Sequence, residues 1–172
     1  MSSRIAVLIV AAGKGERAGL GLPKQYERLA GLPMLRRTVR AFQGYPVQMV
    51  IGAGQQDFAA AALAGLDLAG LDLPAPVTGG ATRQESVRLG LEALAQDAPD
   101  FVLIHDAARP LVSTNVIQAV IQALQAGADG ALPMVAVSDT LRRQDEKGHW
   151  HRIAGTEPYL TGWTDELAEQ VV

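Results

Sequence analysis

Cysteine is absent from this chain of 172 residues, and aromatic residues make up only 5% of it. Without thiols the protein forms no disulfide and offers no thiolate to a metal, which excludes disulfide-framed and cysteine-zinc classes. The chain also has little excess of charge of either sign, because its formal net charge is only -3. Such a protein has no global positive field to hold a nucleic acid or an anionic membrane. Any polyanionic ligand must therefore be bound by local cations and backbone amides.

Long hydrophobic runs are missing as well. The N-terminal residues 1–4 lead into a single short apolar run, 5–12, before the first glycine. This run is too short for the full pattern of a signal peptide or for a membrane-spanning helix. We therefore expect a cytoplasmic protein that binds neither membrane nor nucleic acid. The length and the 48% of hydrophobic residues favour one domain with a substantial core, of the compact α/β enzyme type.

Apolar runs that stop at glycine or polar residues alternate with amphipathic stretches along the chain. Continuous apolar runs predict strands that are buried on both faces of a sheet. The expected strands are 5–12, 47–51, 77–78, 101–104 and 131–137, the last with Pro133 at a bend. The expected helices are 33–44, 57–63, 83–96 and 115–126. Because strands alternating with helices imply parallel crossovers, the chain predicts a doubly wound, mostly parallel α/β sheet.

The last part of the chain, 138–172, is polar and has a different pattern. Mixed charges around Gly148 predict a hairpin at 142–151, within a projecting β-arm at about 138–155. Residues 165–172 have the pattern of a short terminal helix. We assign 1–172 to a single domain from which this arm projects.

A glycine-rich loop directly follows the first strand, and its sequence is Ala11-Ala12-Gly13-Lys14-Gly15-Glu16-Arg17-Ala18. Glycines let backbone N–H groups converge on phosphate oxygens without a Cβ in the way. The same spacing fits a dinucleotide-binding fingerprint, which also requires a long helix at the loop and an acidic residue after the second strand. Here Gly19, Gly21 and Pro23 interrupt any helix, and the second strand ends in Gly52-Ala53-Gly54. We therefore favour a nucleoside triphosphate over a dinucleotide.

Three basic side chains, Lys14, Arg17 and Lys24, belong to this loop or follow it closely. Transfer of a nucleotidyl group passes through a crowded, highly charged phosphorus centre, so catalysis consists mostly of positioning and of stabilisation by cations. Each of these residues alone is also compatible with an ordinary solvated surface charge. The combination of the glycine loop, Arg17 and the segment Pro23-Lys24-Gln25 favours a triphosphate site.

Five short segments of the chain form a set. They are Ala11-Ala12-Gly13-x-Gly15-x-Arg17, Pro23-Lys24-Gln25-Tyr26, Gly79-Gly80-x-x-Arg83-x-x-Ser86-Val87, His105-Asp106-Ala107-Ala108-Arg109-Pro110 and Asp139-Thr140. In this order they cover about residues 5–141, and they resemble the 2-C-methyl-D-erythritol 4-phosphate cytidylyltransferase family. The glycine loop is shared with sugar-phosphate nucleotidyltransferases generally, whereas the third and fourth segments are more specific. The resemblance implies a Rossmann-like nucleotidyltransferase fold.

The resemblance also implies an activity, which joins CTP and 2-C-methyl-D-erythritol 4-phosphate to give 4-diphosphocytidyl-2-C-methyl-D-erythritol and pyrophosphate. It implies Mg²⁺ or another divalent cation, and a homodimer formed by exchange of the arm. By position, Arg17 and Lys24 correspond to catalytic residues that stabilise the transition state. The implied nucleotide-binding residues are Ala11, Ala12, Gly13, Lys14, Gly15, Gly80, Ala81, Ser86 and Asp106. The implied acceptor-binding residues are Asp106, Arg109 and Thr140, and Asp106 is also the implied metal ligand.

The residues themselves leave other roles open. The glycine pair 79–80 is compatible with a plain turn before a helix, and Ser86 with a residue that caps or lines that helix. Asp106 follows a strand at the end where open α/β sheets bind ligands, and a carboxylate among phosphates is expected chiefly with Mg²⁺. Its alternatives are a helix cap or a salt bridge to Arg109. We expect His105 to be structural, because an anionic acceptor phosphate needs no general base.

Two parts of the family's pattern have no match. The segment that supplies an arginine to the acceptor phosphate after the arm is not found, and Arg152 is not a secure substitute. The family also continues beyond its Thr-Asp-Glu segment, matched here at 164–166, to a second acceptor-facing lysine. We therefore expect residues to be missing around 153–163 and at the C-terminal end. Two other functions stay open: a nucleotidyltransferase for another sugar or alcohol phosphate, and a nucleotide-binding domain without turnover.

Overall fold

The computed structural model describes residues 3–13, 22–66, 72–134, 140 and 142–152. The chain divides into two compact units, Met1–Pro133 and Met134–Val172, and each is described by itself. No helix among the described residues is long and apolar enough to cross a membrane. The assignment of the whole chain to one domain stays a prediction.

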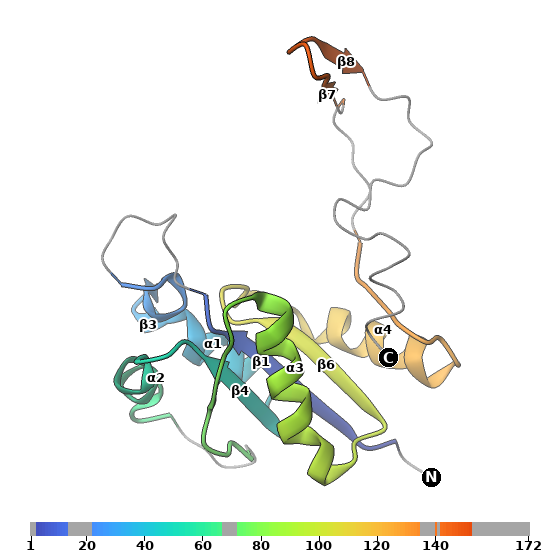
Figure 1. Ribbon diagram of the computed structural model, residues 1–172. Coiled ribbons are helices and arrows are strands. Elements are labelled where there is room, and N and C mark those ends of the chain that lie inside the picture. Colours follow the sequence, from blue (N-terminus) through green and yellow to red (C-terminus); the bar gives the residue numbers. More distant parts are fainter. Residues whose placement is uncertain (1–2, 14–21, 67–71, 135–139, 141, 153–172) are drawn as a thin grey trace. The chain divides into compact units, whose positions relative to one another are not determined.

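Four parallel strands form the sheet of the first unit, in the order β5-β4-β1-β6. Figure 1 shows β1 between β4 and β6. They are β1 (Ile5–Ala11), β4 (Val47–Ile51), β5 (Val77–Thr78) and β6 (Phe101–Asp106). In the centre, Val7 of β1 lies opposite Val47 of β4 and Leu103 of β6. All five residues of β4 and most of β1 are buried. Burial on both faces explains why β1 is a continuous apolar run and why β4 is apolar except for Gln48, and the predicted parallel sheet is confirmed.

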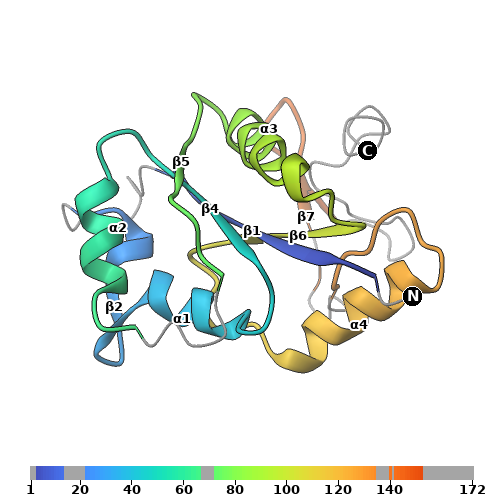
Figure 2. The ribbon, with the colours of Figure 1, turned by 90° about the horizontal axis from the view of Figure 1, so that it is seen from below.

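Helices cover both faces of this sheet (Figure 2). They are α1 (Met34–Ala41), α2 (Gln56–Leu63), α3 (Arg83–Leu94) and α4 (Thr114–Gln125), with short 3-10 turns η2 (Lys24–Tyr26) and η3 (Ala95–Asp97). α3 lies on one face, where Leu94 packs with Leu8 and Val50. α1 and α4 lie on the other face, where the larger core contains Leu35 of α1 and Ile117 of α4. The doubly wound arrangement expected from the sequence is therefore confirmed.

α3 approaches the sheet closely because it presents small residues to it. Ser86, Gly90 and Leu94 are its buried residues, and they recur every four positions along one face. A Cβ added at Gly90 would stand 2.4 Å from Cδ1 of Leu8 and 2.7 Å from Cγ2 of Val50. Gly90 therefore sets the distance between α3 and the sheet.

A two-strand hairpin between the glycine loop and α1 was not expected from the sequence. It consists of β2 (Arg28–Leu29) and β3 (Leu32–Pro33), which pair antiparallel. The turn between them has positive φ angles at Ala30 (48°) and Gly31 (80°). Strands of two residues are too short to show an alternation of apolar and polar residues. The Ala-Gly pair at the turn was therefore their only indication in the sequence.

The strand expected at 131–137 is wrong in its described part. Residues 131–134 have no regular secondary structure, and 135–137 lie outside the described residues. Apolar β-favouring residues suggested this strand, but Pro133 has no N–H to donate to a neighbouring strand. By contrast, β6 is longer than expected and includes His105 and Asp106.

The second unit contains two strands, β7 (Arg142–Gln144) and β8 (Trp150–Arg152). They pair antiparallel, which confirms the hairpin expected at 142–151. Asp145 stabilises the turn, because its Oδ1 accepts hydrogen bonds from the N–H groups of Lys147 (3.0 Å) and His149 (2.8 Å). The helix expected at 165–172 lies outside the described residues.

We predict that Gly90→Ala destabilises the protein by about 1–3 kcal/mol, because the added methyl group overpacks the contact of α3 with Leu8 and Val50. In an exposed helix the same change would stabilise the protein by roughly 0.5–1 kcal/mol, so a loss of stability would itself indicate the packed contact. Urea unfolding measures the difference. Gly130→Ala is the matched control, since no atom lies within 4 Å of its added Cβ. Equal stabilities of the two variants would contradict the packing described here.

Candidate functional site

The loops that follow β1 and β5 meet at the carboxyl edge of the sheet. A Cβ added at Gly79 would stand 2.6 Å from the Cβ of Ala12 and 2.7 Å from Oγ of Ser86. The N–H of Gly79 also donates a hydrogen bond to the carbonyl of Ile51 (2.8 Å). No side chain fits in this space, so glycine at position 79 lets the backbone lie directly against the side chains of Ala12 and Ser86. The structure thus brings together the start of the glycine loop and the turn 79–81, both of which the sequence assigned to a nucleotide.

The turn that leads into α3 is held by its own side chains. Ser86 is buried, and its Oγ accepts a hydrogen bond from Gly80 N–H (3.1 Å) and donates one to the carbonyl of Thr82 (2.9 Å). Thr82 is the N-cap of the helix and accepts from the N–H of Glu85 (3.0 Å). Glu85 Oε2 in turn accepts from Ala81 N–H (2.8 Å). Ser86 therefore lines the helix rather than capping it, and the N–H groups of residues 80 and 81 are already used.

Asp106 at the end of β6 holds two arginines, one on each oxygen. Its Oδ1 accepts from Nη2 of Arg83 (3.0 Å), and its Oδ2 accepts from Nε of Arg109 (3.0 Å). The salt bridge to Arg109, one of the alternatives open from the sequence, is therefore present. The side chains of Arg83 and Arg109 are mostly exposed, at 63% and 76% of their surface. One carboxylate with two arginines leaves a local positive charge that suits a phosphate.

The ionisation of Asp106 follows from these two ion pairs. Its partial burial would raise the pKa of the carboxyl group. The hydrogen bonds and charges of Arg83 and Arg109 act in the opposite direction and outweigh burial, so the pKa of Asp106 lies below its usual value. Asp106 is therefore an anion at neutral pH. Arg83 has no role in the sequence prediction, although it lies within the Gly79-Gly80-x-x-Arg83 segment.

Two side chains behind this cluster fix the loop after β6. His105 Nε2 lies 2.9 Å from the carbonyl oxygen of Arg109, and its ring packs against that of Phe42 in a T-shaped arrangement. Thr38 of α1 is fully buried and donates a hydrogen bond to the carbonyl of Ala107 (2.8 Å). His105 thus has the structural contacts expected from the sequence. Thr38 was missed, because a lone threonine within an amphipathic helix gives no signal of a distant partner.

The remaining candidate residues divide between described and undescribed parts. Ala11 is buried at the end of β1, whereas Gly13 and Lys24 are exposed. Lys14, Gly15 and Arg17 lie outside the described residues. Thr140 belongs to the second unit, so its relation to Asp106 and Arg109 stays a prediction.

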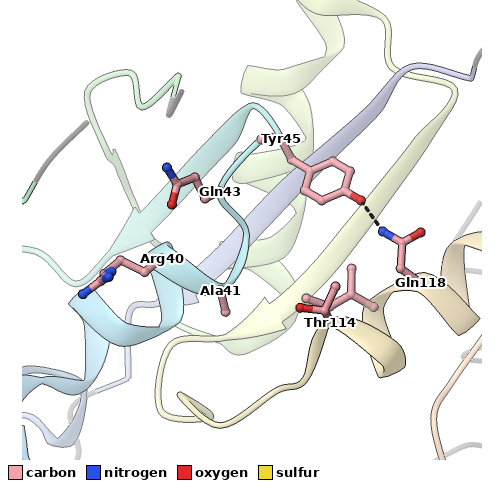
Figure 3. Close-up of a pocket in the computed structure, with 8 residues that line it drawn as sticks. Arg40, Ala41, Gln43, Tyr45, Thr114 and Gln118 are labelled. Carbon is pink, nitrogen blue, oxygen red and sulfur yellow. Dashed lines mark hydrogen bonds between the residues drawn. The ribbon is translucent and has the colours of Figure 1, made fainter. Parts of the chain in front are cut away.

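A shallow pocket of about 450 Å³ occupies a different place in the first unit (Figure 3). It lies between the end of α1 and the start of α4, and Gln118 Nε2 donates a hydrogen bond there to the hydroxyl of Tyr45 (2.9 Å). Tyr45 precedes the amino end of β4, whereas the candidate site follows the carboxyl ends of the strands. The pocket therefore belongs to the opposite end of β4.

A metal site made by protein groups alone is not found in the described part of the chain. No group of three or more histidine and carboxylate side chains there is placed to hold a metal ion. Mg²⁺ commonly binds through one or two carboxylates together with substrate phosphates and water. Both oxygens of Asp106 already pair with Arg83 and Arg109, so a cation that arrives with a triphosphate would share this carboxylate with the two arginines.

The parallel sheet with helices on both faces (Figure 2) is an α/β fold of the Rossmann-like class, and its candidate site follows the carboxyl ends of the strands. The family described as IspD, 2-C-methyl-D-erythritol 4-phosphate cytidylyltransferase, matches residues 5–161. The chain belongs to this family, which confirms the resemblance seen in its motifs.

Individual relatives agree with this assignment. A bifunctional IspD/IspF enzyme of Rhizorhabdus wittichii is 53% identical over 145 residues, which are 82% of this chain and 36% of that protein. The chain therefore spans about a third of the length of the curated relatives it matches. The 4-diphosphocytidyl-2C-methyl-D-erythritol synthase of Anaerococcus prevotii is 25% identical, with a TM-score of 0.70 over 88% of this chain and 63% of that one. A fold neighbour from Mycobacterium tuberculosis, Rv0371c, was solved in complex with manganese (21% identity, TM-score 0.51, 72% of this chain and 61% of that one).

We predict that the carboxyl group of Asp106 titrates below about 3.9, the usual aspartate value, and that its pKa rises in Arg83→Gln because one guanidinium is lost. Carbon-detected NMR titration measures both values, with Arg88→Gln as the control. Since the pKa is lowered on folding, the stabilisation is complete above the unfolded value and is lost as the pH falls through the folded one. A wild-type pKa at or above the usual value would contradict the two ion pairs.

Proposed function

We propose that this chain transfers the cytidylyl group of CTP to 2-C-methyl-D-erythritol 4-phosphate and releases pyrophosphate. The observation that carries the proposal is the contact of Gly79 with Ala12 at the end of β1. Because of it, a base bound at the turn 79–81 and phosphates bound at the glycine loop belong to one nucleotide. Arg83 lies two residues after that turn and pairs with Asp106, which also holds Arg109.

The turn 79–81 favours cytosine. The N–H groups of Gly79, Gly80 and Ala81 all donate hydrogen bonds within the protein. The turn therefore has carbonyl oxygens, rather than N–H groups, to offer to a base. The exocyclic amino group of cytosine is a donor at the position where uracil carries an acceptor, so this turn supports CTP over UTP.

The transfer itself needs charge neutralisation more than proton transfer. An oxygen of the acceptor phosphate attacks the α-phosphorus of CTP, one new P–O bond forms, and the bond to the departing pyrophosphate breaks. The acceptor phosphate is already anionic at neutral pH, so no general base is required. In the proposal, backbone amides at Gly13 and Gly15 and the side chain of Lys14 hold the triphosphate. Arg17 and Lys24 stabilise the charge that develops in the transition state.

The acceptor phosphate is assigned to Arg109 and Thr140. Asp106 contributes by holding the guanidinium groups of Arg83 and Arg109 on its two oxygens. Asp106 together with the triphosphate would also hold a divalent cation, Mg²⁺ by preference, which supplies further charge neutralisation. The proposal also includes a homodimer formed through the arm at about 138–155, which the resemblance implies, and a cytoplasmic location, which rests on the sequence.

The purified protein should release pyrophosphate from CTP when methylerythritol phosphate and Mg²⁺ are present, but not with glucose 1-phosphate or ribitol 5-phosphate. Removal of the cation by EDTA should stop the reaction, and added Mg²⁺ should restore it. A coupled pyrophosphate assay measures each rate. Turnover with a different acceptor would favour another nucleotidyltransferase.

Replacement of Arg17 or Lys24 by alanine should lower kcat on the order of 100- to 1,000-fold, as expected for groups that act chiefly in the transition state. The dissociation constant for CTP, measured by calorimetry, should change by no more than about threefold. Arg88→Ala is the control, because Arg88 is exposed on α3 and pairs with Glu92. Equal losses of turnover and CTP affinity would favour a nucleotide-binding domain without turnover.

A further inference from the structure

Gln25 is a buried side-chain amide next to the exposed Lys24. Both residues lie in the turn η2, where Gln25 has only 4% of its surface exposed. A buried amide without hydrogen bonds is costly, so its partners determine how the turn sits. The sequence motif contains Gln25, but neither the motif nor the proposed chemistry gives it a role.

The amide nitrogen of Gln25 is directed at the end of β1. Its Nε2 donates hydrogen bonds to the carbonyl oxygens of Ala11 (2.7 Å) and Gly13 (3.0 Å). Carbonyl oxygens only accept, so these two partners fix which end of the amide faces them. Gln25 therefore ties the turn that carries Lys24 to the backbone on which the glycine loop begins.

A second glutamine, Gln55, belongs to the same network, and its side-chain oxygen accepts hydrogen bonds where Gln25 donates them. Gln55 Oε1 accepts from Tyr26 Oη (3.0 Å), from Gln25 Nε2 (3.2 Å) and from the N–H of Gly52 (3.3 Å). Gly52 leaves room for it, since a Cβ there would stand 2.6 Å from Nε2 of Gln55. Burial raises the pKa of Tyr26 to about 12, against a smaller effect of Gln25, so the phenol remains a donor at neutral pH.

We propose that Gln25 is a positioning residue for nucleotidyl transfer. It fixes the position of Lys24 relative to the backbone of residues 11–13. The inference rests on the proposed function, because it acts through the catalytic role given there to Lys24. This position of Lys24 depends on hydrogen bonds from the side chain of Gln25 to two carbonyl groups. A displacement of about 1 Å of a catalytic group can lower a rate on the order of 100-fold, so loss of these hydrogen bonds should lower kcat.

The sharpest change is Gln25→Glu, which keeps the shape of the side chain but replaces the donor with an oxygen facing two carbonyl groups. We expect kcat to fall on the order of 30- to 100-fold, with the CTP dissociation constant within about threefold. Gln48→Glu is the matched control. Gln48 is also buried and donates through Nε2 to two carbonyl groups, those of Met49 and Ala75, but it lies in β4 away from the site. Both variants should lose stability, and only Gln25→Glu should lose kcat.

A double-mutant cycle with Lys24→Ala separates positioning from general damage. If Gln25 acts through Lys24, Gln25→Glu should lower kcat by less than about threefold when Lys24 is already replaced. Gln25→Met serves in the same cycle if Gln25→Glu does not fold. Equal effects with and without Lys24, or an equal loss of kcat in Gln48→Glu, would overturn the inference and leave the proposed function intact. A normal kcat in Lys24→Ala alone would contradict the catalytic role of Lys24, and the inference with it.

Discussion

The close approach of the backbone at Gly79 to Ala12 is the constraint on which the site depends. β1 and β5 are not neighbours in the sheet, since β4 lies between them. The loops that follow β1 and β5 meet only because Gly79 has no Cβ to strike Ala12. The carboxyl ends of parallel strands are where open α/β sheets bind ligands, and this contact makes one continuous surface there. Ser86 and Thr82 then hold the turn in place from the first turn of α3.

Local charge, rather than net charge, shapes the site. The chain is slightly acidic overall, yet Asp106 gathers two guanidinium groups at the end of β6. Exposed ion pairs contribute little stability, so their value here lies in fixing the direction of Arg83 and Arg109. The turn that carries Lys24 is held in a different way, by the neutral amides of Gln25 and Gln55. These amides carry no charge, so they hold the turn without neutralising Lys24.

Much of the fold could be predicted from the sequence, because buried parallel strands are mainly apolar runs that stop at glycine or polar residues. The boundaries of β4 were predicted to the residue, whereas 131–134 show that the same pattern around a proline need not form a strand. The short motifs predicted that the glycine loop and the turn 79–81 belong to one site. They could not predict the pairing of Arg83 with Asp106 or the contacts of Gln25. Such partners lie far apart in the chain, and a polar residue in a motif does not reveal which atom it faces.

The most direct measurement is a crystal structure of the protein with CTP and Mg²⁺. The cytosine ring should lie against the turn 79–81 with its amino group on a backbone carbonyl, and the phosphates should extend across Gly13 toward Lys24. A nucleotide bound elsewhere, with the surface between Ala12 and Gly79 unoccupied, would contradict the site described here.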